Sequence, residues 1–204
     1  MNARRIFLIA AMLVVMLSVT LNTPARPVSQ DQEGPSTVTF NMTAQHVGTG
    51  PGGQTPVIIQ VTRWSSSDER DALEEIFIAD GMQALAQALR DAPEVGFIRA
   101  PSIQATGWRL RYAMMYDGGN GKRIIRVATD RPISFAEAMQ RRRATWDFNV
   151  TLIELVVDED GNGEGTLMAG VEFAYDQTND TFGLKSLSSQ PVRLNNVRAT
   201  FSQN

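Results

Sequence analysis

Apolar and polar residues alternate along much of this chain, which is the pattern of strands with one buried face. Residues 37–45 illustrate it, because Val38, Phe40, Met42 and Ala44 fall on one side of an extended segment. Further strand-like segments cover residues 57–64, 107–116, 123–129, 146–157, 165–173, 182–187 and 191–201. Short turns join several of them, so we expect about seven or eight mostly antiparallel strands.

Helical spacing interrupts this pattern in two places. Ser66 followed by Glu69 is a capping-box signature, and Gly81 is expected to break the helix that follows, before a second piece over residues 82–89. A third short helix is predicted over residues 134–141. The predicted class is therefore α+β: a curved sheet, sandwich or open barrel with two or three short helices packed on one side.

The N-terminus reads as a targeting segment. A short lead containing Arg4 and Arg5 precedes an apolar run over residues 6–21, and Ala25 offers a cleavage site. We expect a signal peptide over residues 1–25, a flexible lead-in over 26–35 and a single β-rich domain over 36–204. An exported protein, periplasmic or extracellular, follows; the alternative is an uncleaved N-terminal membrane anchor.

Composition narrows the classes of function. The formal net charge of −3 argues against a nucleic-acid partner, and it leaves the N-terminal segment as the expected route to a membrane. The chain has no cysteine, which excludes disulfides, thiolate zinc sites and cysteine nucleophiles. It has one histidine, His46, and no Gly-x-Ser-x-Gly motif. No catalytic set, metal site or cofactor is predicted.

Residues 158–165, DEDGNGEG, have two interpretations. Asp158, Asp160 and Asn162 alternate as the first ligands of a calcium loop do, and Gly163 stands where such a loop has its glycine. The twelfth position is Ala169 instead of a carboxylate, and the flanking segments look like strands. A tight hairpin turn is therefore preferred, since such turns favour glycine and asparagine.

Two strands supply the candidate ligand-binding residues, Glu154, Arg111, Trp108 and Tyr112. Strict alternation through residues 107–116 would place Trp108, Tyr112 and Tyr116 on one face, and Arg109 and Arg111 on the other. Glu154 shares the even-numbered face of its strand with apolar side chains: Trp146, Phe148, Val150, Leu152 and Val156.

A buried carboxylate needs a partner, and Arg109, Arg111 and Arg126 are the candidates for Glu154. Two interpretations of Glu154 remain open. It has a structural role, as one partner of an ion pair or at a strand end that reaches water, or it lies at the floor of a ligand pocket.

Several short segments occur in a familiar order. They are residues 61–64 (VTRW), 95–99 (VGFIR), 110–113 (LRYA), 128–133 (ATDRPI), 151–155 (TLIEL) and 190–194 (QPVRL). Together they resemble a group of exported, uncharacterised bacterial proteins with no assigned activity. The resemblance implies export and a single domain, and implies nothing about catalysis.

Two functions follow as expectations. The first is a non-catalytic exported protein that acts in binding or in envelope structure through an aromatic and arginine-bearing sheet face, with no partner named by the sequence. The second is a secreted or periplasmic hydrolase-like enzyme that uses Glu154 with a group brought close by the fold.

Overall fold

The computed structural model describes residues 37–45, 53–101, 104–131, 133, 150–176, 178, 181–187 and 190–202. The predicted signal peptide, the lead-in, the helix predicted over 134–141 and residues 146–149 of a predicted strand lie outside these residues.

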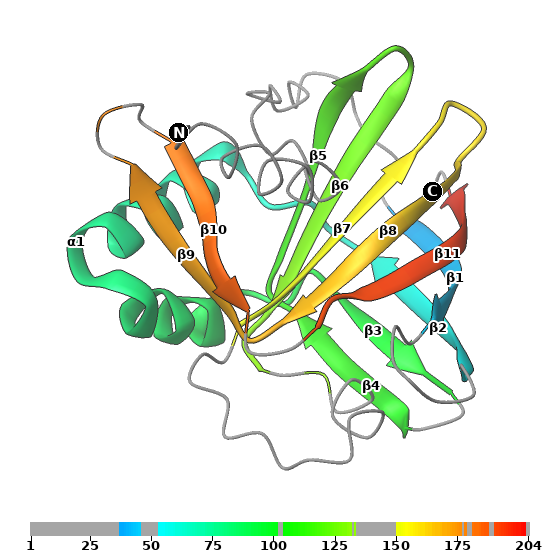
Figure 1. The fold of residues 1–204 in the computed structure, drawn as a ribbon, viewed down its shortest axis with the longest axis horizontal. Coiled ribbons are helices and arrows are strands. Elements are labelled where there is room, and N and C mark those ends of the chain that lie inside the picture. Colours follow the sequence, from blue (N-terminus) through cyan, green and yellow to red (C-terminus); the bar gives the residue numbers. More distant parts are fainter. Residues whose placement is uncertain are drawn as a thin grey trace, which may run out of the picture.

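Nine strands of the described chain form one antiparallel sheet, which curls into a half-barrel (Figure 1). Their order across the sheet is β4-β3-β2-β1-β11-β8-β7-β6-β5. The bounds are β1 Thr37–Gln45, β2 Gln54–Val61, β3 Gly96–Ala100, β4 Gln104–Leu110, β5 Tyr112–Gly119, β6 Lys122–Thr129, β7 Thr151–Val157, β8 Asn162–Ala169 and β11 Val192–Ser202.

A helix and a hairpin lie together on one side of this sheet (Figure 1). The helix α1 spans Ser67–Asp91, and the hairpin pairs β9, Val171–Asp176, with β10, Thr181–Leu187. The centre of the Phe77 ring on α1 lies 6.2 Å from the centre of the Phe173 ring and 5.8 Å from the centre of the Phe182 ring. Aromatic contacts therefore join the helix to the hairpin. Within the described residues, no helix has the length and apolar character needed to cross a bilayer.

The main core occupies the inner face of the half-barrel. Each of the nine strands contributes buried apolar side chains to one continuous cluster, which includes Phe40, Ile59, Trp108, Ile153 and Leu194. Because successive side chains of a strand point to opposite faces, alternate positions fill this interior and the others form the outer face. The interior is therefore packed with side chains.

The predicted class is confirmed in its coarse form, as a curved, mostly antiparallel sheet with helical structure on one side. The strand count and helix number are wrong. Strand β3 was not predicted, and the segments 107–116 and 165–173 each divide in two, at Arg111 and at Gly170, whose φ is 64°. The described residues contain one helix, which is kinked where Gly81 leaves the helical region.

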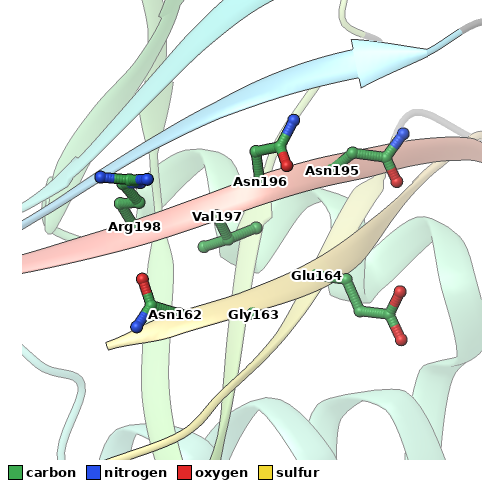
Figure 2. Close-up of a pocket in the computed structure, with 7 residues that line it drawn as sticks. All are labelled: Asn162, Gly163, Glu164, Asn195, Asn196, Val197 and Arg198. Carbon is green, nitrogen blue, oxygen red and sulfur yellow. The ribbon is translucent and has the colours of Figure 1, made fainter. Parts of the chain in front are cut away.

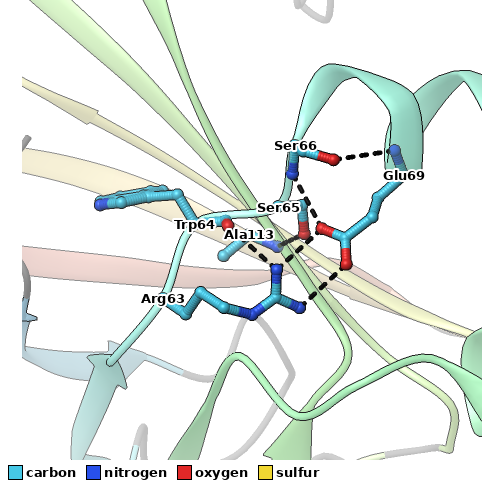
Figure 3. A network of polar contacts seen from close by, with 6 residues as sticks. All are labelled: Arg63, Trp64, Ser65, Ser66, Glu69 and Ala113. Atoms are coloured by element: carbon cyan, nitrogen blue, oxygen red, sulfur yellow. Dashed lines mark hydrogen bonds and ion pairs between the residues drawn. The ribbon is translucent and has the colours of Figure 1, made fainter. Parts of the chain in front are cut away.

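At Arg111 the chain passes from one edge strand of the half-barrel to the other. Strands β4 and β5 follow each other directly, yet they stand at opposite ends of the strand order. Ser65 fastens this junction: its N–H donates to the Ala113 carbonyl oxygen (2.7 Å), and its Oγ accepts from the Ala113 N–H (3.1 Å; Figure 3). The start of edge strand β5 is thereby paired, which hides backbone groups that would otherwise be open to another strand.

The predicted capping box is confirmed at the start of α1 (Figure 3). Ser66 Oγ accepts from the Glu69 N–H (3.1 Å), and Glu69 Oε2 accepts from the Ser66 N–H (2.8 Å). Arg63 adds a two-pronged contact to the Glu69 carboxylate, at 2.8 and 3.1 Å. These hydrogen bonds, above all those from Arg63, hold the pKa of Glu69 below its usual value of 4.5, against the opposing effect of burial.

We expect the contribution of Glu69 to stability to disappear in acid. A carboxyl group whose pKa is lowered by folding stabilises the folded state at every pH above the pKa it has in the unfolded chain. This stabilisation is lost as the pH falls through the lowered pKa of the folded state. Glu69→Gln should therefore reduce the free energy of unfolding at neutral pH and match the wild type well below pH 4.5. Urea unfolding across this pH range measures the difference. Ser66→Ala is the control, with a loss of about 1 kcal/mol throughout, since the hydroxyl does not titrate. An equal effect of Glu69→Gln at all pH values would contradict the assignment.

Candidate functional site

The four residues predicted to bind a ligand do not share one surface. Trp108 is 6% exposed and belongs to the inner core, whereas Tyr112 packs on the outer side with the α1 cluster of Leu85, Ala86 and Leu89. The prediction of a common Trp108/Tyr112 face is wrong, because the junction at Arg111 inverts the alternation. Even-numbered residues of β4 face the interior, but in β5 the odd-numbered Ala113 does.

Arg111 has a structural contact. Its Nη1 donates to the carbonyl oxygen of Ala92 (2.8 Å), the residue that caps the C-terminus of α1. A cation at this position complements the negative end of the helix dipole and satisfies a free carbonyl. Arg111 Nε is buried and has no hydrogen-bond partner among the described residues. The guanidinium therefore ties the strand junction to the helix end.

Glu154 lies on the outer face of the sheet, so the prediction that it shares the core face is wrong. The buried positions of β7 are the odd-numbered ones, including Ile153 and Leu155. Glu154 is directly opposite Arg126 of β6, and Arg126 Nε lies 2.8 Å from Glu154 Oε2. Arg126 is one of the three arginines predicted as its partner, and the ion-pair interpretation is confirmed.

Two tyrosines extend this cluster. The guanidinium of Arg126 stands over the Tyr116 ring at 5.1 Å from its centre, and the Tyr112 and Tyr116 hydroxyl oxygens are 2.8 Å apart. Burial, with the neighbouring Tyr116, raises the pKa of Tyr112 far above its usual value. The cluster is thus a hydrogen-bonded tyrosine pair beside a compensated ion pair, an arrangement suited to holding the outer face of β5–β7 together.

Residues 158–161 of the acidic octapeptide form the hairpin turn between β7 and β8, as preferred from the sequence, and residues 162–165 begin β8. Asp158 Oδ1 accepts from the Asn162 N–H (2.8 Å), and the Asp158 carbonyl oxygen accepts from the Gly161 N–H (3.0 Å). Backbone N–H groups of the turn therefore already use one carboxylate oxygen and the carbonyl oxygen of Asp158. Across the described residues, no three His, Cys, Asp or Glu side chains are grouped so that they could hold a metal ion.

Beside this turn, an open polar groove of about 560 Å³ crosses the outer face of β8 and β11 (Figure 2). Its lining consists of Asn162, Gly163, Glu164, Asn195, Asn196, Val197 and Arg198. Arg198 and Asn162 lie at one end, and Asn195 and Glu164 toward the other (Figure 2).

Backbone irregularity accounts for the groove. The pairing of β11 with β8 shifts between Leu194 and Val197, and Asn196 has a φ of 54°. This is a β-bulge, in which the additional residue re-aims its neighbours and opens the local pairing. Across from it, Gly163 brings the two strands β7 and β8 close together, since an added Cβ would stand 1.9 Å from the Val156 carbonyl oxygen.

The groove continues into a largely polar area on the outer face of the sheet, and three arginines stand on this surface. We call the groove and this area together the arginine face. Arg198, Asn41, Ile58 and Arg99 are successive partners across β11, β1, β2 and β3. Arg193 lies nearer the start of β11, opposite Gln45 and Thr166. All three arginines are exposed, and none forms an ion pair with a described residue.

Charge and hydrogen-bonding groups define what the arginine face can do. Amide and hydroxyl side chains accompany the arginines: Asn41 and Gln45 stand beside Arg198 and Arg193, and Thr39, Thr200 and Gln60 lie in the next row beyond Arg198. Arg109 at the edge is 3.3 Å from Glu94, so its charge is partly compensated. The arginine face can therefore attract negative charge and form many hydrogen bonds to hydroxyl groups.

Sequence reasoning missed this face. Arg193 and Arg198 are five residues apart and would fall on opposite sides of a regular strand. The bulge at Asn195 and Asn196 brings them to the same side, and no pattern of residue types in the sequence predicts this bulge. Only the general expectation of an arginine-bearing sheet face anticipated the type of surface, with different residues.

Fold and site define a class: an antiparallel half-barrel with a filled interior and an open, arginine-bearing groove on its outer surface. The chain matches no protein-family model, no curated protein and no solved structure.

Proposed function

We propose that this chain is an exported, non-catalytic binding protein that holds an acidic polysaccharide of the cell envelope on its arginine face. The observation that carries the proposal is the group Arg99, Arg193 and Arg198, three exposed arginines without an acidic partner in the described chain, on a protein whose net charge is −3. Positive charge gathered on one face of an acidic protein attracts an anionic partner, and it orients the approach.

The spacing of the arginines favours an extended partner. Arg99 and Arg198 are separated by three inter-strand distances, which is about 14 Å for a sheet. A small anion bound to one guanidinium would not reach the next. A polymer with repeated negative charges can contact all three at once, and simultaneous contacts increase its affinity.

The polar residues around the arginines favour a polysaccharide over a lipid surface. Apart from Ile58, which is half-buried, the residues named beside the arginines are amides and hydroxyls, which donate and accept hydrogen bonds as sugar hydroxyls do. Binding to a bilayer surface would be strengthened by exposed aromatic or large apolar side chains. Only Ile78, on α1, is strongly exposed among the large apolar residues described.

The surroundings of Glu154 favour the non-catalytic function over the hydrolase-like alternative. Its carboxylate is paired with Arg126, and its neighbour on the other side is Thr166 of β8. General acid and base chemistry on a glycoside needs two carboxyl groups that flank the bond to be broken. Neither position beside Glu154 in its row supplies a second one.

Export remains part of the proposal and rests on the basic and apolar pattern of residues 1–25. A mature chain that begins at Arg26 is the expected sign of it. Mass spectrometry of the protein recovered from its native cells would detect that N-terminus, and a chain that still begins at Met1 in the cytoplasm would exclude export.

Binding to polygalacturonate, a soluble acidic polysaccharide, tests the function. We expect binding that weakens with salt, and a loss of about tenfold in affinity for the double variant Arg99→Ala/Arg198→Ala, since each exposed charge contributes up to about 1 kcal/mol. The matched control Arg90→Ala/Lys185→Ala removes the same charge away from the arginine face and should leave affinity within about twofold of its value. Isothermal titration at two ionic strengths measures both.

Three results would refute the proposal. One is the absence of binding to polygalacturonate by the wild-type chain. Another is binding to phosphatidylglycerol vesicles alone, which would identify a membrane surface as the partner. The third is an equal loss of affinity in the two double variants, which would show that net charge matters but the arginine face does not.

A further inference from the structure

We infer that Glu164 is the specificity residue of the groove and selects a hydroxyl-bearing acidic sugar over a phosphate polymer. This inference rests on the proposed function and names the residue of the arginine face that distinguishes one anionic partner from another. Three arginines alone would attract any polyanion, including polyphosphate. A negative charge placed among them needs an explanation.

Glu164 occupies a defined place in the groove. It lies on the outer face of β8 opposite Val156, where the bulge of β11 leaves the pairing open. Its side chain is exposed and lines the groove together with Asn195, Asn196 and Arg198 (Figure 2).

Glu164 and Arg198 do not neutralise each other. No ion pair joins them, and neither has one with any other residue that the structure describes. The groove between them therefore presents a donor group at one end and an acceptor group at the other.

A stretch of acidic polysaccharide that runs along the groove can satisfy both ends. Its carboxylate can accept from the Arg198 guanidinium, which offers paired N–H donors. Its hydroxyl groups can donate to the Glu164 carboxylate, which only accepts when ionised. The amide of Asn196 can serve as donor or acceptor between them, and the volume of about 560 Å³ is within the range of small-molecule sites.

A phosphate polymer satisfies only one end. Its ionised units have no hydroxyl donor for Glu164, and each brings a negative charge close to that carboxylate. Specificity often depends on such a repulsive element beside the attractive ones. Glu164 thus rejects phosphate while the arginines attract both polymers.

The experiment compares the affinity of two probes, polygalacturonate and polyphosphate, for the full chain and for two variants of Glu164. We expect the wild type to prefer polygalacturonate. Glu164→Gln keeps an acceptor oxygen but removes the charge, so polyphosphate should bind about fivefold more tightly, while polygalacturonate changes little. Glu164→Ala removes the acceptor as well, so polygalacturonate should bind about fivefold less tightly than to the wild type.

Controls separate this inference from the proposed function. Arg193→Ala should weaken both probes together, because that residue attracts charge without lining the groove. If the wild type binds neither probe, the proposed function fails. If it binds both equally and Glu164→Gln leaves their ratio unchanged, the arginine face still binds polyanions but the role of Glu164 is refuted. Thermal unfolding should be unchanged in each variant, since all these side chains are exposed.

Discussion

Replacing Gly163 by alanine is expected to destabilise the protein by about 3 kcal/mol or more, because it forces a methyl group into a neighbouring strand. The added Cβ would lie 1.9 Å from the Val156 carbonyl oxygen and 2.8 Å from its carbonyl carbon. Both are backbone atoms of β7 and cannot move aside without breaking the β7–β8 pairing. Thermal unfolding should show a fall in Tm of at least about 6 °C, from the usual 2–4 °C per kcal/mol at this chain length.

Gly183→Ala is the matched control for that prediction. Gly183 lies in β10, and a Cβ built there meets no atom within 4 Å. Alanine at Gly183 should leave Tm unchanged or raise it slightly, because it restricts the unfolded chain. Equal stability of Gly163→Ala and the wild type would mean that β7 and β8 are not paired in the register described.

Replacing Ile153 by alanine should cost about 2–5 kcal/mol, the range for removing a large apolar side chain from a packed core. Ile153 is fully buried, and its partners across the sheet, Val127 and Leu167, are fully buried as well. The three side chains form a row through the centre of the core, so the vacated volume has little room to collapse. Urea unfolding would give the loss in free energy directly.

Two further variants test whether the large loss of stability is confined to the inner face of the sheet. Leu152→Ala removes a side chain of similar size from the adjacent, half-buried outer position, and should be milder. Ile78→Ala deletes the same side chain from α1, where it is 47% exposed, and should change stability by less than about 1 kcal/mol. A larger loss for Leu152→Ala than for Ile153→Ala would reverse the assignment of inner and outer faces in β7.

The groove and the core are linked through the same strands. Alternate residues of β7 and β8 fill the interior, while Glu164 and its neighbours stand on the opposite side. The filled half-barrel supports the arginine face from behind, which would limit the conformational entropy lost on binding of the proposed partner. The Glu154–Arg126 pair and the two tyrosines stiffen the adjoining part of the outer face.

Local features of this protein were determined by the sequence itself. Period-two alternation identified most strands, Ser66 and Glu69 marked the start of α1, and Gly81 marked its kink. The glycine-rich octapeptide indicated the β7–β8 turn. Each of these depends on interactions within a few residues along the chain, namely side-chain direction in a strand, capping hydrogen bonds and the φ range of glycine.

Only the tertiary structure decided which side of each strand is the inside. Alternation gives two faces but does not say which one is covered, so Glu154 was assigned to the wrong face of β7. At Arg111 the chain changes partner from β3 to β6 and inverts the alternation, which separates Trp108 from Tyr112. The bulge at Asn195 and Asn196 brings Arg193 and Arg198 to one face. Pairing between strands distant in the sequence sets all three, because a shift of one residue in register moves every following side chain to the other side.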